Sequence, residues 1–331
     1  MQQSGSLSAL VEPIKAEQRE ERLAFSIVIP VYDEEQSLPL LYEQLTTQLQ
    51  KLGQSYEIIF VDDGSRDNSF KVMEELHQRD AAVKAIRFRR NFGKTPALMA
   101  GFQRCRGDII FTMDADLQDD PAEIPAFLEK LNEGHDLVSG WKFPRHDPLS
   151  KTLPSKVFNK TVALTTGVTL HDMNCGFKAY RREVIDELRI YGELHRFIPV
   201  LAAGRGFRIT EIKVLHHPRK YGVSKFGAKR FTRGLLDLLS VLFLTTYMRT
   251  PLRLFGTLGF LNFLIGFLID LYVLGLKIFA GEQISRHPIV FLGIVFMIFG
   301  LSMVLTGFQS EMIRYYNYQS RHEYSIRQVL D

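Results

Sequence analysis

Two long apolar runs near the C-terminal end constrain this 331-residue chain more than any other feature. They cover residues 254–276 and 289–308, and only a short loop around residues 281–283 separates them. Because roughly 20 apolar residues cross the hydrocarbon core of a bilayer, each run is long enough to span a membrane. We predict a two-span transmembrane hairpin over residues 251–313, followed by a tail over residues 314–331. The competing interpretation, two buried helices of a soluble domain, fits the length and the Gly, Phe and Leu content less well.

The basic residues that flank the hairpin predict its orientation. They are more numerous outside the connecting loop than within it, and cytoplasmic loops carry the excess of Lys and Arg. We therefore expect a multi-pass protein of the cytoplasmic membrane, with the large domain and the C-terminal tail facing the cytoplasm. The residues concerned are Arg249 and Arg253 before the hairpin, Arg314, Arg321 and Arg327 after it, and Lys277 and Arg286 in the loop.

Residues 226–250 have a shorter apolar centre, residues 235–244, which cannot cross a bilayer. Lys229, Arg230 and Arg233 precede this centre. Such an arrangement is typical of an amphipathic helix that lies in the membrane interface. We expect this juxtamembrane helix to hold the large domain against the bilayer.

Asp270 lies within the first apolar run, where a carboxylate costs about 2.5–3.5 kcal/mol on insertion scales. It is therefore expected to face protein rather than lipid. One interpretation is a subunit contact, which would make the protein a homo-oligomer, or a role in handling a lipid. The other is a tolerated polar position near the outer end of the helix.

Composition excludes several classes of function. The net charge of +4 is too small to predict binding to nucleic acid. Cys105 and Cys175 lie far apart in the sequence, so neither a disulfide framework nor a zinc site is predicted. Residues 1–24 read as a polar leader without the apolar segment of a signal peptide, which agrees with a large domain in the cytosol.

Short β-branched runs alternate with helical spacing between residues 25 and 139. Strands are predicted at residues 26–31, 57–61, 83–88, 108–113 and 136–139, and helices at 34–53, 68–79, 95–104 and 121–132. This alternation predicts an α/β domain over residues 25–225, with a mostly parallel sheet covered by helices on both faces. In such sheets ligands bind at the carboxyl ends of the strands. Polar clusters follow the first, second and fourth strands, so we expect the functional site there.

Asp114, Ala115 and Asp116 directly follow the fourth predicted strand. Alternate carboxylates can both reach one divalent ion where the chain turns, and Mg²⁺ and Mn²⁺ prefer carboxylate ligands and bridge phosphate oxygens. A D-x-D pair alone is usually a solvated turn, but the position at a strand end strengthens the metal interpretation.

Two further strand ends carry polar residues with two interpretations each. Asp63, in the run of residues 62–65 (DDGS), is either a ligand of a base or ribose or part of a plain Asp-Gly turn. Tyr32, after the first strand, either stacks on a base or belongs to the capping turn of the next helix.

Taken together, the motifs resemble those of a known enzyme family. Residues 26–35 (SIVIPVYDEE), 61–65 (VDDGS) and 114–118 (DADLQ), in this order, resemble inverting glycosyltransferases of family 2 with the GT-A fold. Residues 174–178 (NCGFK) and 219–225 (RKYGVSK) resemble the polyisoprenyl-phosphate branch, which includes dolichol-phosphate mannose synthases and bactoprenol glucosyltransferases. The resemblance implies a Rossmann-like GT-A catalytic domain, a nucleotide-sugar donor, a polyisoprenyl-phosphate acceptor in the membrane, and Mg²⁺ or Mn²⁺ as cofactor.

The resemblance also implies a role for each matching residue. The nucleotide sugar would be bound by Pro30, Tyr32, Glu34, Val61, Asp63, Asp114, Ala115 and Lys142. The metal would be held by Asp114, Asp116 and Gln118, and the acceptor phosphate by Arg145, Ser155, Lys156, Arg219 and Lys225. The catalytic set would be Asp116, Asp172, Arg219 and Lys225. Asp172 would serve as base or orienter of the acceptor, or else is a structural turn residue.

In the implied reaction an oxygen of the lipid phosphate attacks the anomeric carbon and expels a nucleoside diphosphate with inversion. A phosphate monoester has a second pKa near 6, so the acceptor is already largely dianionic and needs no strong base. Residues 141–160 form a basic, proline-punctuated loop that would close over the donor and guide the lipid head group. The competing interpretation is a solvated basic face beside anionic lipids.

Two departures from the family pattern bear on the donor. Lys142 stands where many dolichol-type relatives have arginine, and Cys175 stands where they often have serine. Lysine cannot form the bidentate fork of arginine, which favours glucose from UDP-glucose as the donor and undecaprenyl phosphate as the acceptor. The alternatives are a GDP-mannose-dependent mannose synthase and a non-catalytic scaffold that binds sugar nucleotides. A processive polysaccharide synthase is not favoured, because Trp141, the only tryptophan, lacks the Gln-x-x-Arg-Trp context of those enzymes.

Overall fold

The computed structural model describes residues 22–143, 159–164, 166–188, 190, 192, 194–218, 251–280 and 288–318. These residues fall into two compact units, which are described separately. The first unit holds Met1–Asp147, Asn174–His195 and Arg208–Ser224, and the second holds Pro148–Met173, Arg196–Phe207 and Lys225–Asp331. The predicted boundaries of the leader, the catalytic domain and the tail stay predictions.

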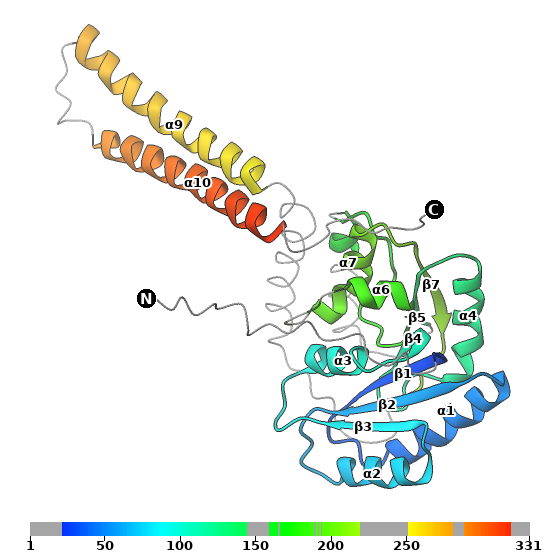
Figure 1. Cartoon of the computed structure of the whole chain (residues 1–331). Helices are drawn as coiled ribbons and strands as arrows, with labels where there is room; N and C mark the ends of the chain where they lie inside the picture. Colours follow the sequence, from blue (N-terminus) through cyan, green and yellow to red (C-terminus); the bar gives the residue numbers. More distant parts are fainter. Residues whose placement is uncertain are drawn as a thin grey trace, which may run out of the picture. The chain divides into compact units, whose positions relative to one another are not determined.

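The first unit is built on a seven-stranded sheet with the order β3-β2-β1-β4-β6-β5-β7 (Figure 1). Its strands are β1 (Leu23–Val31), β2 (Tyr56–Asp62), β3 (Val83–Arg87), β4 (Gly107–Thr112), β5 (Leu137–Lys142), β6 (Lys178–Arg181) and β7 (Ile209–Val214). The β1/β2, β1/β4, β2/β3 and β5/β7 pairings are parallel. The two pairings made by β6 are antiparallel, so the sheet is mixed but mostly parallel, as predicted.

Helices follow the strands along the chain, also as predicted. They are α1 (Leu38–Leu52), α2 (Ser69–Arg79), α3 (Lys94–Phe102), the short η2 (Pro121–Glu123) leading into α4 (Ile124–Asn132), and α6 (Arg182–Glu187). The first of these begins four residues later than predicted. Glu34 instead starts a turn, in which its carbonyl accepts hydrogen bonds from the N–H groups of Ser37 and Leu38 at 3.2 Å.

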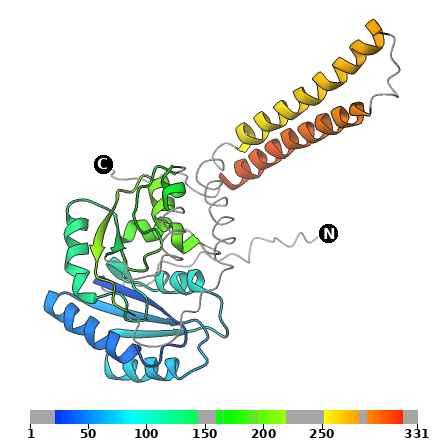
Figure 2. The ribbon, with the colours of Figure 1, turned by 180° about the vertical axis from the view of Figure 1, so that it is seen from behind.

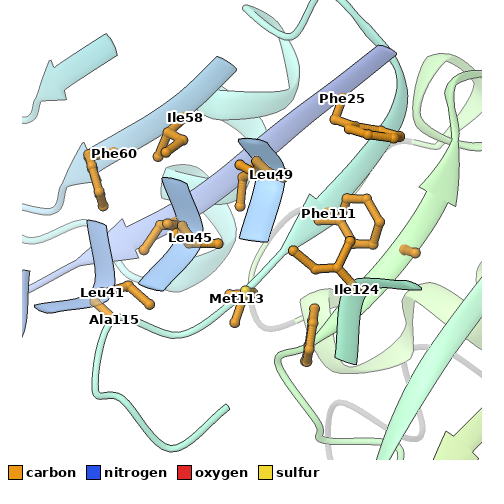
Figure 3. Packing of buried hydrophobic residues seen from close by; sticks show 14 of the residues in the cluster. Phe25, Leu41, Leu45, Leu49, Ile58, Phe60, Phe111, Met113, Ala115 and Ile124 are labelled. Carbon is orange, nitrogen blue, oxygen red and sulfur yellow. The ribbon is translucent and has the colours of Figure 1, made fainter. Parts of the chain in front are cut away.

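Helices cover both faces of the sheet. On one face Leu41, Leu45 and Leu49 of α1 point toward the strands and pack with Ile58 and Phe111 (Figure 3). On the other face α3 lies so close that a Cβ on Gly101 would sit 2.3 Å from a methyl group of Val28. The two ribbon views agree that α1 and α2 lie on one side and α3 on the other (Figure 1, Figure 2).

The short strand β6 decides which residues reach the functional edge of the sheet. Because it runs antiparallel between β4 and β5, it begins at the edge where those two strands end. Lys178, its first residue, is the partner of both Thr112 and Ser139. The turn before it, which holds Gly176, is therefore brought to the carboxyl end of β4.

The second unit contains α7 (Ile198–Gly204) and two long helices, α9 (Pro251–Ala280) and α10 (Ile289–Tyr318), which pack as a hairpin. Both are long and apolar enough to cross a membrane, and only 11% of the apolar window of each is buried. That exposure contradicts the interpretation as core helices of a soluble domain. The short η3 (Leu194–Phe197) precedes α7.

Glycines let α9 and α10 approach backbone to backbone. A Cβ on Gly259 would lie 2.5 Å from the carbonyl oxygen of Gly300, and one on Gly266 would lie 2.3 Å from that of Gly293. Asp270 faces α10 as expected, because a Cβ on Gly293 would sit 2.1 Å from its Oδ1. Within the described residues that Oδ1 is buried without a hydrogen-bond partner.

The predicted juxtamembrane helix over residues 226–250 and most of the loop between the two spans lie outside the described residues. The side chains after residue 313 also lie outside them. The orientation of the hairpin in a membrane therefore stays a prediction.

Candidate active site

The predicted motifs meet at one edge of the sheet. The register pairs Val31 with Asp62 and Val28 with Thr112, so β1, β2 and β4 end side by side. The strand β5 runs in the same direction as β4, because both are antiparallel to β6. Its last residue, Lys142, therefore comes to the same edge. This register brings the predicted motifs to one edge of the sheet, and the location of the functional site at that edge stays a prediction.

The loops after β1 and β2 are fastened to each other. Asp33 has a φ of 52°, its N–H donates to Ser65 Oγ at 3.0 Å, and its Oδ1 accepts from the Arg66 N–H at 2.7 Å. The N–H of Glu34 donates to Ser69 Oγ at 2.8 Å. These bonds fix the turn that follows β1, next to Tyr32 in the sequence, which is half-buried.

Asp63 is buried and accepts hydrogen bonds from two backbone N–H groups, those of Phe92 at 2.7 Å and Gly93 at 2.9 Å. Burial raises the pKa of Asp63 despite these bonds. The carboxylate thus holds the loop before α3 against the end of β2. Val61 is fully buried and Pro30 is half-buried, and the predicted contacts of all three residues with a nucleotide stay predictions.

The D-x-D turn after β4 has a constrained backbone. Leu117 has a φ of 59°, a conformation that non-glycine residues rarely adopt and that clusters at functional sites. Asp116 is 9% exposed, and its Oδ1 accepts from the Gln118 N–H at 3.3 Å. Asp114 is half-buried and forms an ion pair with Lys94, the first residue of α3.

Three lysines surround this turn, and the sequence analysis identified only one of them. Lys142 lies 3.8 Å from Asp119 Oδ1, and Lys178 donates to the carbonyl of Cys175. Burial alone would raise the pKa of Asp114, but Lys94, Lys142 and Lys178 outweigh it and hold that pKa well below its usual range. The site is therefore a cluster of carboxylates balanced by ammonium groups.

Asp119 is the most deeply buried carboxylate of the cluster, with 2% of its surface exposed. Neither of its oxygens has a hydrogen-bond partner among the described residues. Burial raises the pKa of Asp119, and the charge of Asp114 adds to the effect while Lys142 opposes it. Lys142 therefore sits between two carboxylates rather than in open solvent.

The segment after β7 is fastened to the same turn. The N–H of His217 donates to the Gln118 carbonyl at 2.9 Å, and the Gln118 amide nitrogen donates to the carbonyl of His217 at 3.3 Å. The same amide nitrogen lies 3.3 Å from His216 Nε2. His216 and His217 were not among the residues predicted for the site.

Several predicted site residues are not brought to this cluster by the described structure. Asp172 is buried and belongs to the second unit, and its role as base or orienter stays a prediction. The five residues predicted for the acceptor phosphate lie outside the described residues, and they are Arg145, Ser155, Lys156, Arg219 and Lys225.

Known proteins resemble the chain over nearly its whole length. The model of glycosyl transferase family 2 matches residues 26–189. Dodecaprenyl-phosphate galacturonate synthase of Rhizobium johnstonii is 38% identical over 333 residues, covering 98% of each chain. Undecaprenyl-phosphate 4-deoxy-4-formamido-L-arabinose transferase of Pseudomonas aeruginosa is 37% identical over 309 residues, covering 92% of this chain and 90% of the relative.

Solved structures share the fold of the first unit at much lower identity. Glucosyl-3-phosphoglycerate synthase from Mycobacterium tuberculosis, in complex with Mn²⁺ and UDP-glucose, superposes with a TM-score of 0.52 and 16% identity. The match covers 68% of this chain and 79% of that chain, and it establishes the GT-A fold. The family match and the two relatives show that the chain belongs to glycosyl transferase family 2, in the branch of polyisoprenyl-phosphate glycosyltransferases.

Proposed function

We propose that this enzyme transfers a sugar from a nucleotide donor to undecaprenyl phosphate, or a similar polyprenyl phosphate, at the cytoplasmic surface of a membrane. The observation that carries the proposal is the combination, in one chain, of the strand-edge cluster around Asp114 and Asp116 with a membrane-length helical hairpin. The names of the two relatives support a polyprenyl phosphate as acceptor.

The acceptor phosphate needs no strong base, whereas the negative charge that develops on the leaving diphosphate must be stabilised. A phosphate oxygen of the lipid forms a bond to the anomeric carbon, and the bond from that carbon to the nucleoside diphosphate breaks. The electron pair leaves with the diphosphate, so negative charge grows there. Cations held in place before the reaction stabilise such charge, and Lys142 and Lys178 are held beside the motif by Asp119 and the Cys175 carbonyl.

The donor set fits a divalent cation such as Mg²⁺ or Mn²⁺. Carboxylate and amide oxygens are the ligands that these ions prefer, and Asp114, Asp116 and Gln118 supply them. Asp114 already has a cation beside it in the form of Lys94, so its environment accommodates positive charge. When bound, the ion would neutralise charge on the diphosphate. Among the described residues no three His, Cys, Asp or Glu side chains converge as a ready-made metal site, so the substrate's phosphates would complete the coordination.

Which sugar the enzyme transfers is a separate question from the identity of the acceptor. The names of the two relatives contain galacturonate and 4-deoxy-4-formamido-L-arabinose. These two sugars are therefore supported by sequence similarity to the relatives, and glucose is not. UDP-glucose remains the prediction that rests on Lys142 and Cys175, and GDP-mannose remains the alternative.

A donor panel tests the proposed function. The purified full chain is incubated with undecaprenyl phosphate and either Mg²⁺ or Mn²⁺. The donors are UDP-galacturonate, UDP-4-deoxy-4-formamido-L-arabinose, UDP-glucose and GDP-mannose. We expect one donor to give a labelled glycolipid and an equal amount of nucleoside diphosphate. Binding of a donor with no lipid-dependent release of diphosphate would instead favour the non-catalytic scaffold.

Gly176 offers a test of the site's geometry. A Cβ at this position would lie 2.6 Å from Asp114 Oδ2, so Gly176→Ala should push the carboxylate aside while the fold persists. Misplacement of a site group by about 1 Å can cost about 10²-fold in rate, and we expect a loss of that order in glycolipid formation. Gly275→Ala, where a Cβ meets nothing within 4 Å, is the control. Full activity of Gly176→Ala would show that the position of Asp114 does not matter.

A further inference from the structure

Lys94 occupies the position beside Asp114 that a metal ion would need. Its ammonium group contacts Asp114 Oδ1, and the two side chains are 29% and 31% exposed. The other two lysines of the cluster have different direct partners, Asp119 for Lys142 and the Cys175 carbonyl for Lys178. Lys94 is therefore the lysine that holds the first carboxylate of the motif.

The fold holds Lys94 in place from behind. The Asp63 carboxylate accepts hydrogen bonds from the backbone N–H groups of Phe92 and Gly93, the two residues immediately before Lys94. Gly64, with a φ of 74°, packs so tightly against the loop that a Cβ there would lie 2.5 Å from the carbonyl carbon of Arg90. The backbone before Lys94 is thus fixed to the end of β2, and the flexible part is the lysine side chain itself.

Lys94 also heads α3, a helix of nine residues. The N-terminus of a helix carries partial positive charge and favours anions. An ammonium group released from Asp114 would remain at this positive end, on the edge of the sheet where the strands β1, β2 and β4 finish. An anionic diphosphate held at that edge is the group that such a side chain would meet.

A metal ion and the Lys94 ammonium cannot both stay in direct contact with Asp114 without repulsion, because like charges a few ångströms apart destabilise each other. We propose that Lys94 is a resident counter-ion of Asp114, that metal binding displaces it, and that it then turns to the donor's diphosphate. This inference rests on the proposed function. It makes Lys94 a positioning residue before the donor binds and a ligand of the leaving group afterwards.

Binding of Mn²⁺ without nucleotide tests the first half of the proposal. Free Mn²⁺ is measured by its electron paramagnetic resonance signal in titrations of the full chain, its Lys94→Met variant and its Asp116→Asn variant. Removing the competing ammonium should tighten Mn²⁺ binding by about tenfold or more. Lys130→Met, which removes an exposed lysine paired with Glu133 outside the site, should leave the affinity unchanged.

The outcomes separate this inference from the proposed function. Mn²⁺ binding that depends on Asp116 but does not tighten in Lys94→Met would overturn the counter-ion and leave the metal site standing. Mn²⁺ binding that Asp116→Asn does not weaken, or no Mn²⁺ binding to any of the proteins, would overturn the displacement of Lys94 by a metal ion, whereas the donor panel tests the proposed function separately.

Binding of UDP in the presence of saturating Mn²⁺ tests the second half. A charged hydrogen bond to phosphate contributes about 1.5–3 kcal/mol, so Lys94→Met should weaken UDP binding by about tenfold or more. Lys94→Arg keeps the charge and should retain most of the affinity. Equal UDP affinity in wild type and Lys94→Met would overturn the transfer of Lys94 to the diphosphate. Fluorescence of Trp141 verifies that each variant is folded.

Discussion

Replacing Asp116 by alanine is expected to lower sugar transfer by about 10²- to 10³-fold, the size of effect seen when a fixed group that stabilises transition-state charge is removed. The reason is its place in the turn. Asp116 follows the end of β4 and is 9% exposed, and its Oδ1 is oriented by the Gln118 N–H. It is the carboxylate that we expect to hold the metal most directly.

The measurement is lipid-dependent release of nucleoside diphosphate by the full chain, with Mn²⁺ at saturation. Asp108→Asn is the matched control, because Asp108 lies near the other end of the same strand and, within the part of the chain that the structure describes, its side chain makes only an exposed pair with Arg22 at 3.5 Å. That variant should be as active as wild type. Normal turnover by a folded Asp116→Ala protein would show that Asp116 is not a site residue, and it would overturn the proposed metal site.

Replacing Glu57 by alanine is expected to lower the free energy of unfolding of the first unit by about 3 kcal/mol, as removal of one partner of a buried ion pair does. Glu57 has 1% of its side chain exposed and lies at the start of β2. It accepts from Ser26 Oγ at 2.7 Å, from the Arg106 N–H at 2.6 Å, and from Lys84 Nζ at 2.6 Å. Its loss leaves these donors unpaired at the edge of the sheet opposite the site.

Trp141, the only tryptophan, lies in β5 and reports this unfolding in urea. Glu43→Ala, an exposed glutamate of α1, is the control and should change the free energy by no more than about 0.5 kcal/mol. Glu57→Ala should keep the activity per folded molecule. A Glu57→Ala variant as stable as wild type would show that the hydrogen bonds and ion pair of Glu57 contribute no net stability.

The lowered pKa of Glu57 predicts that the free energy of unfolding depends on pH. Burial alone would raise the pKa of Glu57, but hydrogen bonds from Lys84, Ser26 and the Arg106 backbone lower it below its ordinary value of 4.5. A carboxyl with a lowered pKa contributes stability above its unfolded pKa and loses it as the pH falls through the folded value. The difference in stability between wild type and Glu57→Ala should therefore be full at pH 7 and shrink below about pH 4.5.

The strands β1 to β5 and the hairpin were predictable because their patterns are local, whereas β6 and β7 were not predicted. Short β-branched runs bounded by turn residues, such as residues 57–61, favour buried strands, and a run of about 20 apolar residues is long enough to cross a bilayer whatever precedes it. The start of α1 was less predictable. The helical spacing of leucines begins near Glu34, but hydrogen bonds between the β1 and β2 loops, such as Glu34 N–H to Ser69 Oγ, hold that residue outside the helix.

The sequence by itself determined the family, because the order of motifs around Asp63, Asp114 and Asp116 identifies it without coordinates, and it predicted the residues that we expect to carry the chemistry. It could not assign a partner to Asp114. Lys94 and Gly176 lie 20 residues before it and 62 residues after it, and neither spacing has meaning until the strands pair. Only the tertiary structure brings the start of α3 and the turn before the antiparallel β6 to the end of β4. The physical reason is that ion pairs and close packing act over a few ångströms, whereas their sequence separation is set by the sheet topology.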